Sequence, residues 1–161
     1  MKTLILFDSY FGNTEKIARA IAKAFDGDNE FEIKRNSEAT PEELANYELL
    51  IIGSPTRGFQ PTEDVAKLIK ALPSKSLTNI KIAAFDTRVL LETIKSKFFR
   101  KVVDVGGYAA KSINKKLVQK GAVSIIEPEG FYVMDTEGPL KDGELKRAEN
   151  WGQQIKTLFN N

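Results

Sequence analysis

Short apolar runs alternate along this chain with segments of helical periodicity, and this alternation restricts the fold more than any other feature. Apolar residues three and four positions apart predict helices, and short apolar stretches that end at a turn residue predict strands. Strands are predicted at residues 3–7, around Phe31 and Ile33, and at 49–52, 80–85 and 123–126. This order favours an α/β protein with a three-layer, doubly wound, five-stranded parallel sheet and right-handed crossovers.

The helices between these strands each have one apolar face. They are predicted around residues 17–24, 65–72, 109–117 and 143–159, and Pro73 ends the second of them. Trp151, in the last helix, is predicted to pack in the core. Residues 129–133 are expected to extend the last strand. An amphipathic segment at 90–102 contains the cluster Phe98–Phe99–Arg100–Lys101, which we interpret as a core anchor with solvated charges.

The length of 161 residues fits a single domain, which we expect to span 1–161. The sequence contains no Cys and no His. Disulfide scaffolds, Cys-ligated zinc, iron–sulfur clusters, thiol nucleophiles and the Ser-His-Asp arrangement are therefore excluded. Any redox or acid–base chemistry must therefore use carboxylates, Lys, Tyr, backbone groups or a bound cofactor. We predict no catalytic side chain and no metal site.

The formal net charge of +2 is unevenly distributed, because residues 89–121 hold eight Lys and Arg residues against Glu92 and Asp104. We interpret this basic segment as the solvated side of helices, with steering of an acidic protein or nucleic acid as the alternative. The apolar run at 3–7 is too short for a signal peptide or a membrane span. We therefore expect a cytoplasmic protein without a membrane span.

Ligands in such sheets bind beyond the carboxyl ends of the strands, here at residues 8–14, 53–60 and 86–88. In the first of these loops, the hydroxyls of Ser9 and Thr14, the Asn13 amide and the N–H groups at the helix start can bind a phosphate. A helix N-cap role for Asn13 or Thr14 is the alternative.

Two other classes of phosphate chemistry fit the sequence poorly. The first loop lacks the Gly-Lys-Ser/Thr of a P-loop and the G-x-G-x-x-G of a dinucleotide-binding fold, which disfavours a nucleoside triphosphatase. A receiver domain would have Asp at the end of the third strand and Lys at the end of the fifth. Gly53 and Glu127–Pro128 stand there instead, which disfavours phosphoacceptor chemistry.

The run from Asp8 to Ala18 (DSYFGNTEKIA) resembles the FMN-phosphate loop of the flavodoxin family, and the run from Gly53 to Phe59 (GSPTRGF) resembles its second flavin loop. The resemblance covers essentially the whole chain. It implies a flavodoxin-like sheet with strand order 2-1-3-4-5, non-covalently bound FMN and transient redox protein partners. Phe11 stands where the family pattern has a hydroxyl residue, so one phosphate donor is missing.

The resemblance assigns cofactor binding to residues of all three loops. These residues are Ser9, Tyr10, Phe11, Gly12, Asn13, Thr14, Pro55, Thr56, Arg57, Gly58, Phe59, Asp86, Thr87 and Arg88. Gly58 is then the glycine whose peptide can flip toward the flavin. Tyr10, Phe59 and Tyr108 are the candidates for stacking on the flavin, and core packing is the alternative for each.

Two departures from the family pattern concern charge. Arg57 and Phe59 flank Gly58, where many flavodoxins have an aromatic and an acidic residue, and Arg88 lies in the third loop. We hypothesise that Arg57 and Arg88 favour the anionic reduced flavin and so make its potential less negative than in acidic flavodoxins. The alternative is that both arginines point to solvent or pair with Asp64 and Glu63.

Three functional classes follow from these features. The first is an FMN-binding electron-transfer protein that shuttles electrons between redox partners. The second is an FMN-dependent NAD(P)H:quinone-type oxidoreductase, since Pro55–Thr56–Arg57 resembles the flavodoxin-like reductases of that kind. The third is a non-redox binding module on the same fold. Nucleic acid is disfavoured as a partner, and the oligomeric state is not predicted.

Overall fold

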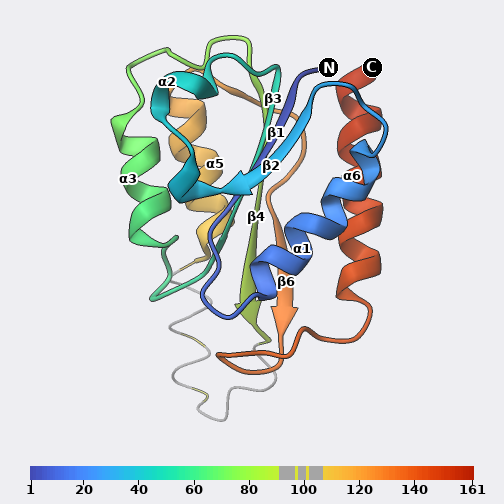
Figure 1. Cartoon of the computed structure of the whole chain (residues 1–161). Coiled ribbons are helices and arrows are strands. Elements are labelled where there is room, and N and C mark those ends of the chain that lie inside the picture. The colour runs from blue at the N-terminus through green and yellow to red at the C-terminus, as the bar shows by residue number, and fades with distance from the viewer. Residues whose placement is uncertain (91–96, 98–100, 102–106) are drawn as a thin grey trace.

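The computed structural model describes residues 1–90, 97, 101 and 107–161, which form a parallel sheet between two layers of helices (Figure 1). Its strands are β1 (Thr3–Phe7), β2 (Phe31–Arg35), β3 (Leu49–Pro55), β4 (Lys81–Val89), β5 (Val123–Ser124) and β6 (Glu129–Val133). All pairs are parallel, and neighbours follow the order β2-β1-β3-β4-β5. The predicted doubly wound fold with strand order 2-1-3-4-5 is therefore confirmed.

The fifth strand of the prediction is divided into two pieces, β5 and β6, and both pair with β4. Ser124 pairs with Ile82, and Glu129 pairs with Phe85. The edge strand therefore uses more residues than β4 between these two pairs, and the ladder is interrupted there. β6 continues along the same edge of β4, as expected for residues 129–133.

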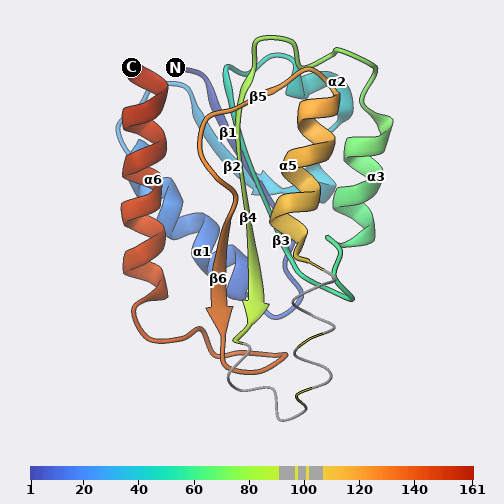
Figure 2. The same ribbon diagram turned by 180° about the vertical axis from the view of Figure 1, so that it is seen from behind.

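Helices cover the sheet on both sides, as the views from front and back show (Figure 1; Figure 2). One face carries α1 (Asn13–Ala22), the 3₁₀ turn η1 (Lys23–Phe25) and α6 (Glu144–Asn160). The other carries η2 (Asn36–Glu38), α2 (Pro41–Leu44), α3 (Glu63–Ala71) and α5 (Ala109–Gln119). Each face buries its own apolar cluster against the sheet.

Trp151, on the inner face of α6, packs in the core, as predicted. Its ring meets the rings of Phe85 and Phe131 edge to face, with centroids 6.3 Å and 6.1 Å away. Gly53 makes room for this cluster, because a Cβ atom there would lie 2.0 Å from the Phe85 ring. The aromatic cluster supports the carboxyl half of the sheet, where the three predicted loops begin.

Strand β4 is longer than the sequence predicted, and residues 86–88 belong to the strand rather than to a loop. The ladder continues because Thr87 pairs with Pro55 and Val89 pairs with Val133. Successive side chains of a strand point to opposite faces. Asp86 and Arg88 therefore point toward the α5 side of the sheet, and Thr87 points toward the α1 side.

The predicted amphipathic segment at 90–102 and the cluster Phe98–Phe99–Arg100–Lys101 lie largely outside the described residues, so their interpretation stays a prediction. In the part of the chain that is described, no helix is long and apolar enough to cross a membrane.

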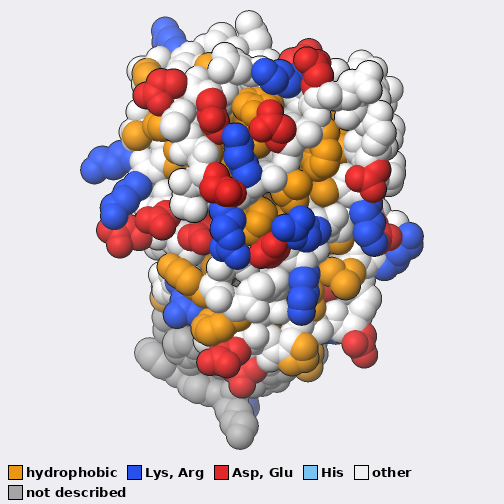
Figure 3. Space-filling model, in the orientation of Figure 1, with side chains coloured by type: hydrophobic (Ala, Val, Ile, Leu, Met, Phe, Trp, Pro, Cys, Tyr) orange, Lys and Arg blue, Asp and Glu red, His pale blue; other side chains and the backbone are white. Residues whose placement is uncertain are grey.

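Acidic and basic side chains are interspersed on the face that carries β2 and α1 (Figure 3). Several of them form ion pairs, among them Lys34 with Glu43 at 2.8 Å and Arg35 with Glu15 at 3.0 Å. This face therefore presents compensated charge.

Candidate functional site

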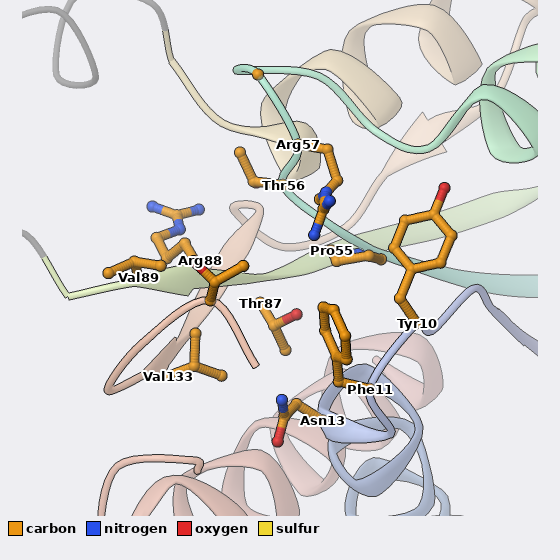
Figure 4. A pocket seen from close by; sticks show the side chains of 12 residues that line it. Tyr10, Phe11, Asn13, Pro55, Thr56, Arg57, Thr87, Arg88, Val89 and Val133 are labelled. Atoms are coloured by element: carbon orange, nitrogen blue, oxygen red, sulfur yellow. The ribbon is translucent and has the colours of Figure 1, made fainter. Parts of the chain in front are cut away.

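A cavity of about 260 Å³ opens at the carboxyl ends of β1, β3 and β4, where the sequence predicts a ligand (Figure 4). Its lining includes many of the predicted residues, namely Tyr10, Phe11, Asn13, Pro55, Thr56, Arg57, Gly58, Thr87 and Arg88. Val89, Val133 and Thr136 also line it and were not predicted. The structure thus brings all three predicted loops to one cavity.

The loop after β1 turns sharply into α1. Gly12 precedes the helix with φ 88°, and the Ser9 hydroxyl accepts hydrogen bonds from the N–H of Gly12 (3.1 Å) and of Glu15 (3.4 Å). Within the described residues, no acceptor is bonded to the N–H of Tyr10, Phe11, Asn13 or Thr14. These open donors at the positive end of a helix dipole form a site for an anion.

Neither Asn13 nor Thr14 is the N-cap of α1, so that alternative is wrong. Gly12 holds the cap position, and the Asn13 amide instead donates to the backbone oxygen of Glu137 at 3.0 Å. The buried Thr14 hydroxyl lies 2.7 Å from the hydroxyl of Thr87 on β4. Both side chains therefore hold the loop against neighbouring parts of the site.

Arg35 supports the same loop and was not predicted as a site residue. Its guanidinium donates to the backbone oxygen of Ser9 at 3.2 Å and to Glu15 at 3.0 Å. Arg35 ends β2, the strand that pairs with β1. Its place at the carboxyl end of a strand next to β1 is the sequence signal that could have identified it.

The loop after β3 forms a tight two-residue turn. Arg57 and Gln60 exchange backbone hydrogen bonds of 2.9 Å and 3.0 Å, and Gly58 and Phe59 between them have φ 52° and 69°. Positive φ at both central residues is typical of a type I′ turn, in which a bulky residue such as Phe59 is strained. Phe59 and Tyr108 do not line the cavity, so of the three stacking candidates the structure brings Tyr10 alone to it.

Thr56 connects this loop to the start of α5. Its N–H donates to the backbone oxygen of Thr87 at 2.9 Å, and its hydroxyl accepts from the N–H of Ala109 at 3.0 Å. The two loops and the helix are thereby fixed relative to one another.

Asp86 and Arg88 form a buried ion pair behind the cavity. The guanidinium donates to both carboxylate oxygens at 2.7 Å, and Asp86 also accepts from the N–H of Ala110 at 2.9 Å. Burial raises the pKa of the Asp86 carboxyl, and the hydrogen bond and charge of Arg88 oppose this rise. Asp86 itself does not reach the cavity lining, whereas Arg88 does.

Arg88 is held on its other sides by an aromatic ring and a glycine. Its guanidinium carbon lies 3.6 Å from the centroid of the Tyr108 ring. A Cβ atom at Gly130 would lie 2.1 Å from the same carbon, so only glycine leaves room for this side chain. For Arg88, the alternative of pointing to solvent or pairing with Asp64 and Glu63 is therefore wrong.

Arg57 and the two neighbouring aromatic residues of the first loop form the exposed rim of the cavity. Tyr10 is 57% exposed and Phe11 is 47% exposed. The Arg57 guanidinium lies 5.2 Å from the centroid of the Tyr10 ring and 6.0 Å from that of Phe11. Core packing of Tyr10, the alternative to a place at the site, is therefore wrong.

Comparison with known proteins identifies relatives of this chain. A family model described as Flavodoxin matches residues 5–151. No curated protein sequence matches. Oxidised Flavodoxin 1 from Bacillus cereus is 21% identical, with a TM-score of 0.74 over 99% of this chain and 97% of that chain.

Two other solved structures share the fold at lower identity. A flavodoxin, WrbA-like protein from Agrobacterium tumefaciens has a TM-score of 0.70 and 15% identity, over 99% of this chain and 97% of that one. Rubredoxin oxygen:oxidoreductase from Desulfovibrio gigas has a TM-score of 0.72 and 19% identity, over 99% of this chain but 36% of that one. The same fold therefore occurs alone and as part of a larger protein.

Proposed function

This chain belongs to the flavodoxin family, whose members bind FMN and transfer electrons, and we propose that it carries electrons between protein redox partners. Bound FMN supplies the electron chemistry, and the protein positions the flavin and sets its electronic environment. The observation that carries the proposal is the meeting of an anion site and an aromatic, partly apolar cavity at the carboxyl ends of β1, β3 and β4.

The loop between β1 and α1 is the proposed phosphate site. Its open N–H groups at Tyr10, Phe11, Asn13 and Thr14 and its two hydroxyl residues supply donors without a cationic side chain. The Ser9 oxygen accepts two N–H groups, so its own hydrogen is free to point toward an anion. These features fit a phosphate group such as that of FMN, even though Phe11 replaces one hydroxyl donor.

The rest of the cavity is the proposed site of the flavin ring. Pro55, Val89 and Val133 provide apolar contacts, and the rings of Tyr10 and Phe11 stand at the rim. The backbone of Thr56, Arg57 and Gly58 passes along the same cavity. Apolar walls with a few placed polar groups are typical of cofactor sites.

The charge on α5 supports an acidic redox partner. Residues 109–120 contain no Asp or Glu, and none of Lys111, Lys115, Lys116 and Lys120, here called the α5 lysines, pairs with a carboxylate of the described residues. The helix begins beside the cavity, where Ala109 and Ala110 donate to Thr56 and Asp86. A partner held by this positive surface approaches the proposed flavin site, and electrostatic steering suits a transient encounter.

The second candidate is an FMN-dependent NAD(P)H:quinone-type oxidoreductase. The exposed Arg57 at the rim of the cavity, within the triplet Pro55–Thr56–Arg57, is the observation that favours it. The two functions predict different behaviour of the purified protein. A carrier accepts electrons from a reduced redox protein but oxidises NADH and NADPH slowly by itself, whereas an oxidoreductase oxidises one of them rapidly with a quinone present.

The experiment that tests the proposal mixes the FMN-loaded protein with a chemically reduced, acidic ferredoxin and follows the flavin absorbance by stopped flow. Fast electron transfer together with slow NAD(P)H oxidation supports the carrier. Fast NAD(P)H oxidation without the ferredoxin overturns it in favour of the oxidoreductase. The cytoplasmic location stays a prediction.

A further inference from the structure

Two arginines among the described residues line the cavity, and they differ in how far their charge is compensated. Arg88 is 14% exposed and holds the Asp86 carboxylate in a bidentate pair. No carboxylate of the described residues pairs with Arg57, whose guanidinium rests near the rings of Tyr10 and Phe11. The opposite charges of Arg88 and Asp86 are adjacent, so their electrostatic fields largely cancel at distances larger than the separation between the two groups. Among the described residues that line the cavity, the uncancelled positive charge therefore belongs to Arg57.

The two guanidinium groups also lie on different sides of the cavity (Figure 4). Arg57 extends from the loop after β3 toward Tyr10 and Phe11, whereas Arg88 lies beside Val89. Asp135 and Glu137 follow β6 in the segment that brings Thr136 to the cavity, and both are exposed. Neither forms an ion pair with Arg57, so neither compensates its charge by direct contact.

We infer that Arg57, and not Arg88, sets the reduction potential of bound FMN by stabilising the reduced flavin anion. This inference rests on the proposed function. Two electrons from a redox partner and one proton from solvent convert the neutral oxidised ring into this anion, and a second proton makes the reduced ring neutral. A cation at the rim of the cavity stabilises the anion relative to both neutral forms.

The expected size of the effect follows from the exposure of Arg57. A nearby opposite charge favours an ionised group by one to three pKa units, and an exposed guanidinium stands at the lower end of this range. We expect removal of the charge to weaken the binding of reduced FMN, relative to that of oxidised FMN, by about tenfold. For a two-electron couple this corresponds to about 30 mV.

The test compares the potentials of bound FMN in the wild type and three variants, by equilibrium titration with mediator dyes. Arg57→Gln is expected to lower the potential by the stated amount, and Arg57→Lys, which keeps the charge, is expected to restore most of it. Arg88→Gln is expected to change this relative affinity less than threefold, because the Asp86 carboxyl left behind is buried and takes up a proton. Arg19→Gln on the exposed side of α1 is the matched control.

A pH series separates this electrostatic effect from a structural one. The difference between wild type and Arg57→Gln is expected to shrink at acidic pH, where the reduced flavin is neutral. Asp86→Asn leaves the Arg88 charge uncompensated. The potential of FMN bound to this variant is therefore expected to rise, whereas Arg57→Gln is expected to lower it. If Asp86→Asn does not fold, the Arg57 and Arg88 variants still decide the question.

Two results would overturn the inference. One is an unchanged potential in Arg57→Gln, and the other is a shift in Arg88→Gln as large as in Arg57→Gln. Failure of the proposed function looks different. Either the wild-type protein does not retain FMN and no potential can be measured, or the FMN-loaded wild type oxidises NADH or NADPH rapidly, a result that leaves the comparison of the variants' potentials intact.

Discussion

The side-chain hydroxyls of Thr14 and Thr87 lie 2.7 Å apart and join the loop after β1 to strand β4. Both residues are buried, and they come from parts of the chain that are distant in sequence. Two hydroxyl groups carry two hydrogens, and their mutual hydrogen bond uses one. The other remains available near the loop where we propose that the phosphate binds, so this contact supports both the fold and the proposed cofactor site.

Removing either hydroxyl is expected to weaken both stability and FMN binding. Thr87→Val leaves the Thr14 hydroxyl buried without its partner, which we expect to lower the free energy of unfolding by about 1–3 kcal/mol. The double variant Thr14→Val/Thr87→Val is expected to lose less stability than the two single losses added together, because no unpaired hydroxyl remains. Urea unfolding of the four proteins measures the coupling, and strictly additive losses would contradict it.

The aromatic residues at the site are expected to contribute unequally to FMN binding. Tyr10→Ala and Phe11→Ala each remove a ring from the rim of the cavity, which we expect to raise the Kd for FMN by up to about tenfold. Phe59→Asn is the matched control, because Phe59 does not line the cavity and Asn tolerates its positive φ. Fluorescence titration with FMN measures all three, and a larger effect for Phe59→Asn than for Tyr10→Ala would count against the site.

The buried ion pair predicts a pH-dependent stability in one variant. Burial raises the pKa of Asp86, and Arg88→Gln removes the guanidinium that opposes the rise. The folded variant then keeps its proton to a higher pH than the unfolded chain does. The contribution of Asp86 to the free energy of unfolding is largest below the unfolded carboxyl pKa, about 4, and falls as the pH rises toward the raised folded pKa.

The loss is expected to be about 1.4 kcal/mol for each unit by which the two pKa values differ. Urea unfolding across this pH range measures the slope. The double variant Asp86→Asn/Arg88→Gln lacks the titrating group and is expected to lack the additional slope. Equal slopes in the single and double variants would show that Asp86 is not its source.

The α5 lysines are expected to steer an acidic partner. Changing Lys111, Lys115 and Lys116 to Gln is expected to slow electron transfer from a reduced acidic ferredoxin at low salt and to flatten its dependence on ionic strength. The matched control changes Lys23, Lys146 and Lys156, which pair with Glu149 or Asp28 on the α1 and α6 face. Stopped-flow rates that respond equally to both triple variants would argue against steering by α5.

Much of the fold and of the site follows from the sequence, because buried parallel strands and helix faces have distinct periodicities. The loop after β1 and the turn at Gly58 carry enough local pattern to be assigned to a flavin site. Val133 and Thr136 carry none, since they reach the cavity only because β6 pairs with β4 and the following loop returns toward Asn13.

The Asp86–Arg88 pair shows a different limit of sequence interpretation. Its residues are two positions apart and share one face of a strand, a pattern that periodicity can reveal. The sequence prediction ended the buried strand at Phe85, so Asp86 and Arg88 were assigned to a loop and their pairing was not foreseen. The charges are covered by Ala110 of α5 and by Tyr108, the residue that precedes this helix. Local sequence around Asp86 and Arg88 does not specify these contacts.

The most direct measurement compares the binding of FMN and riboflavin, which share the ring and differ by the phosphate. The purified protein is titrated with each ligand by flavin fluorescence and then desalted. We predict that FMN is retained and that riboflavin, which cannot use the open N–H groups between β1 and α1, binds at least about tenfold more weakly. Equal affinity for both ligands, or failure to retain FMN, would contradict the account.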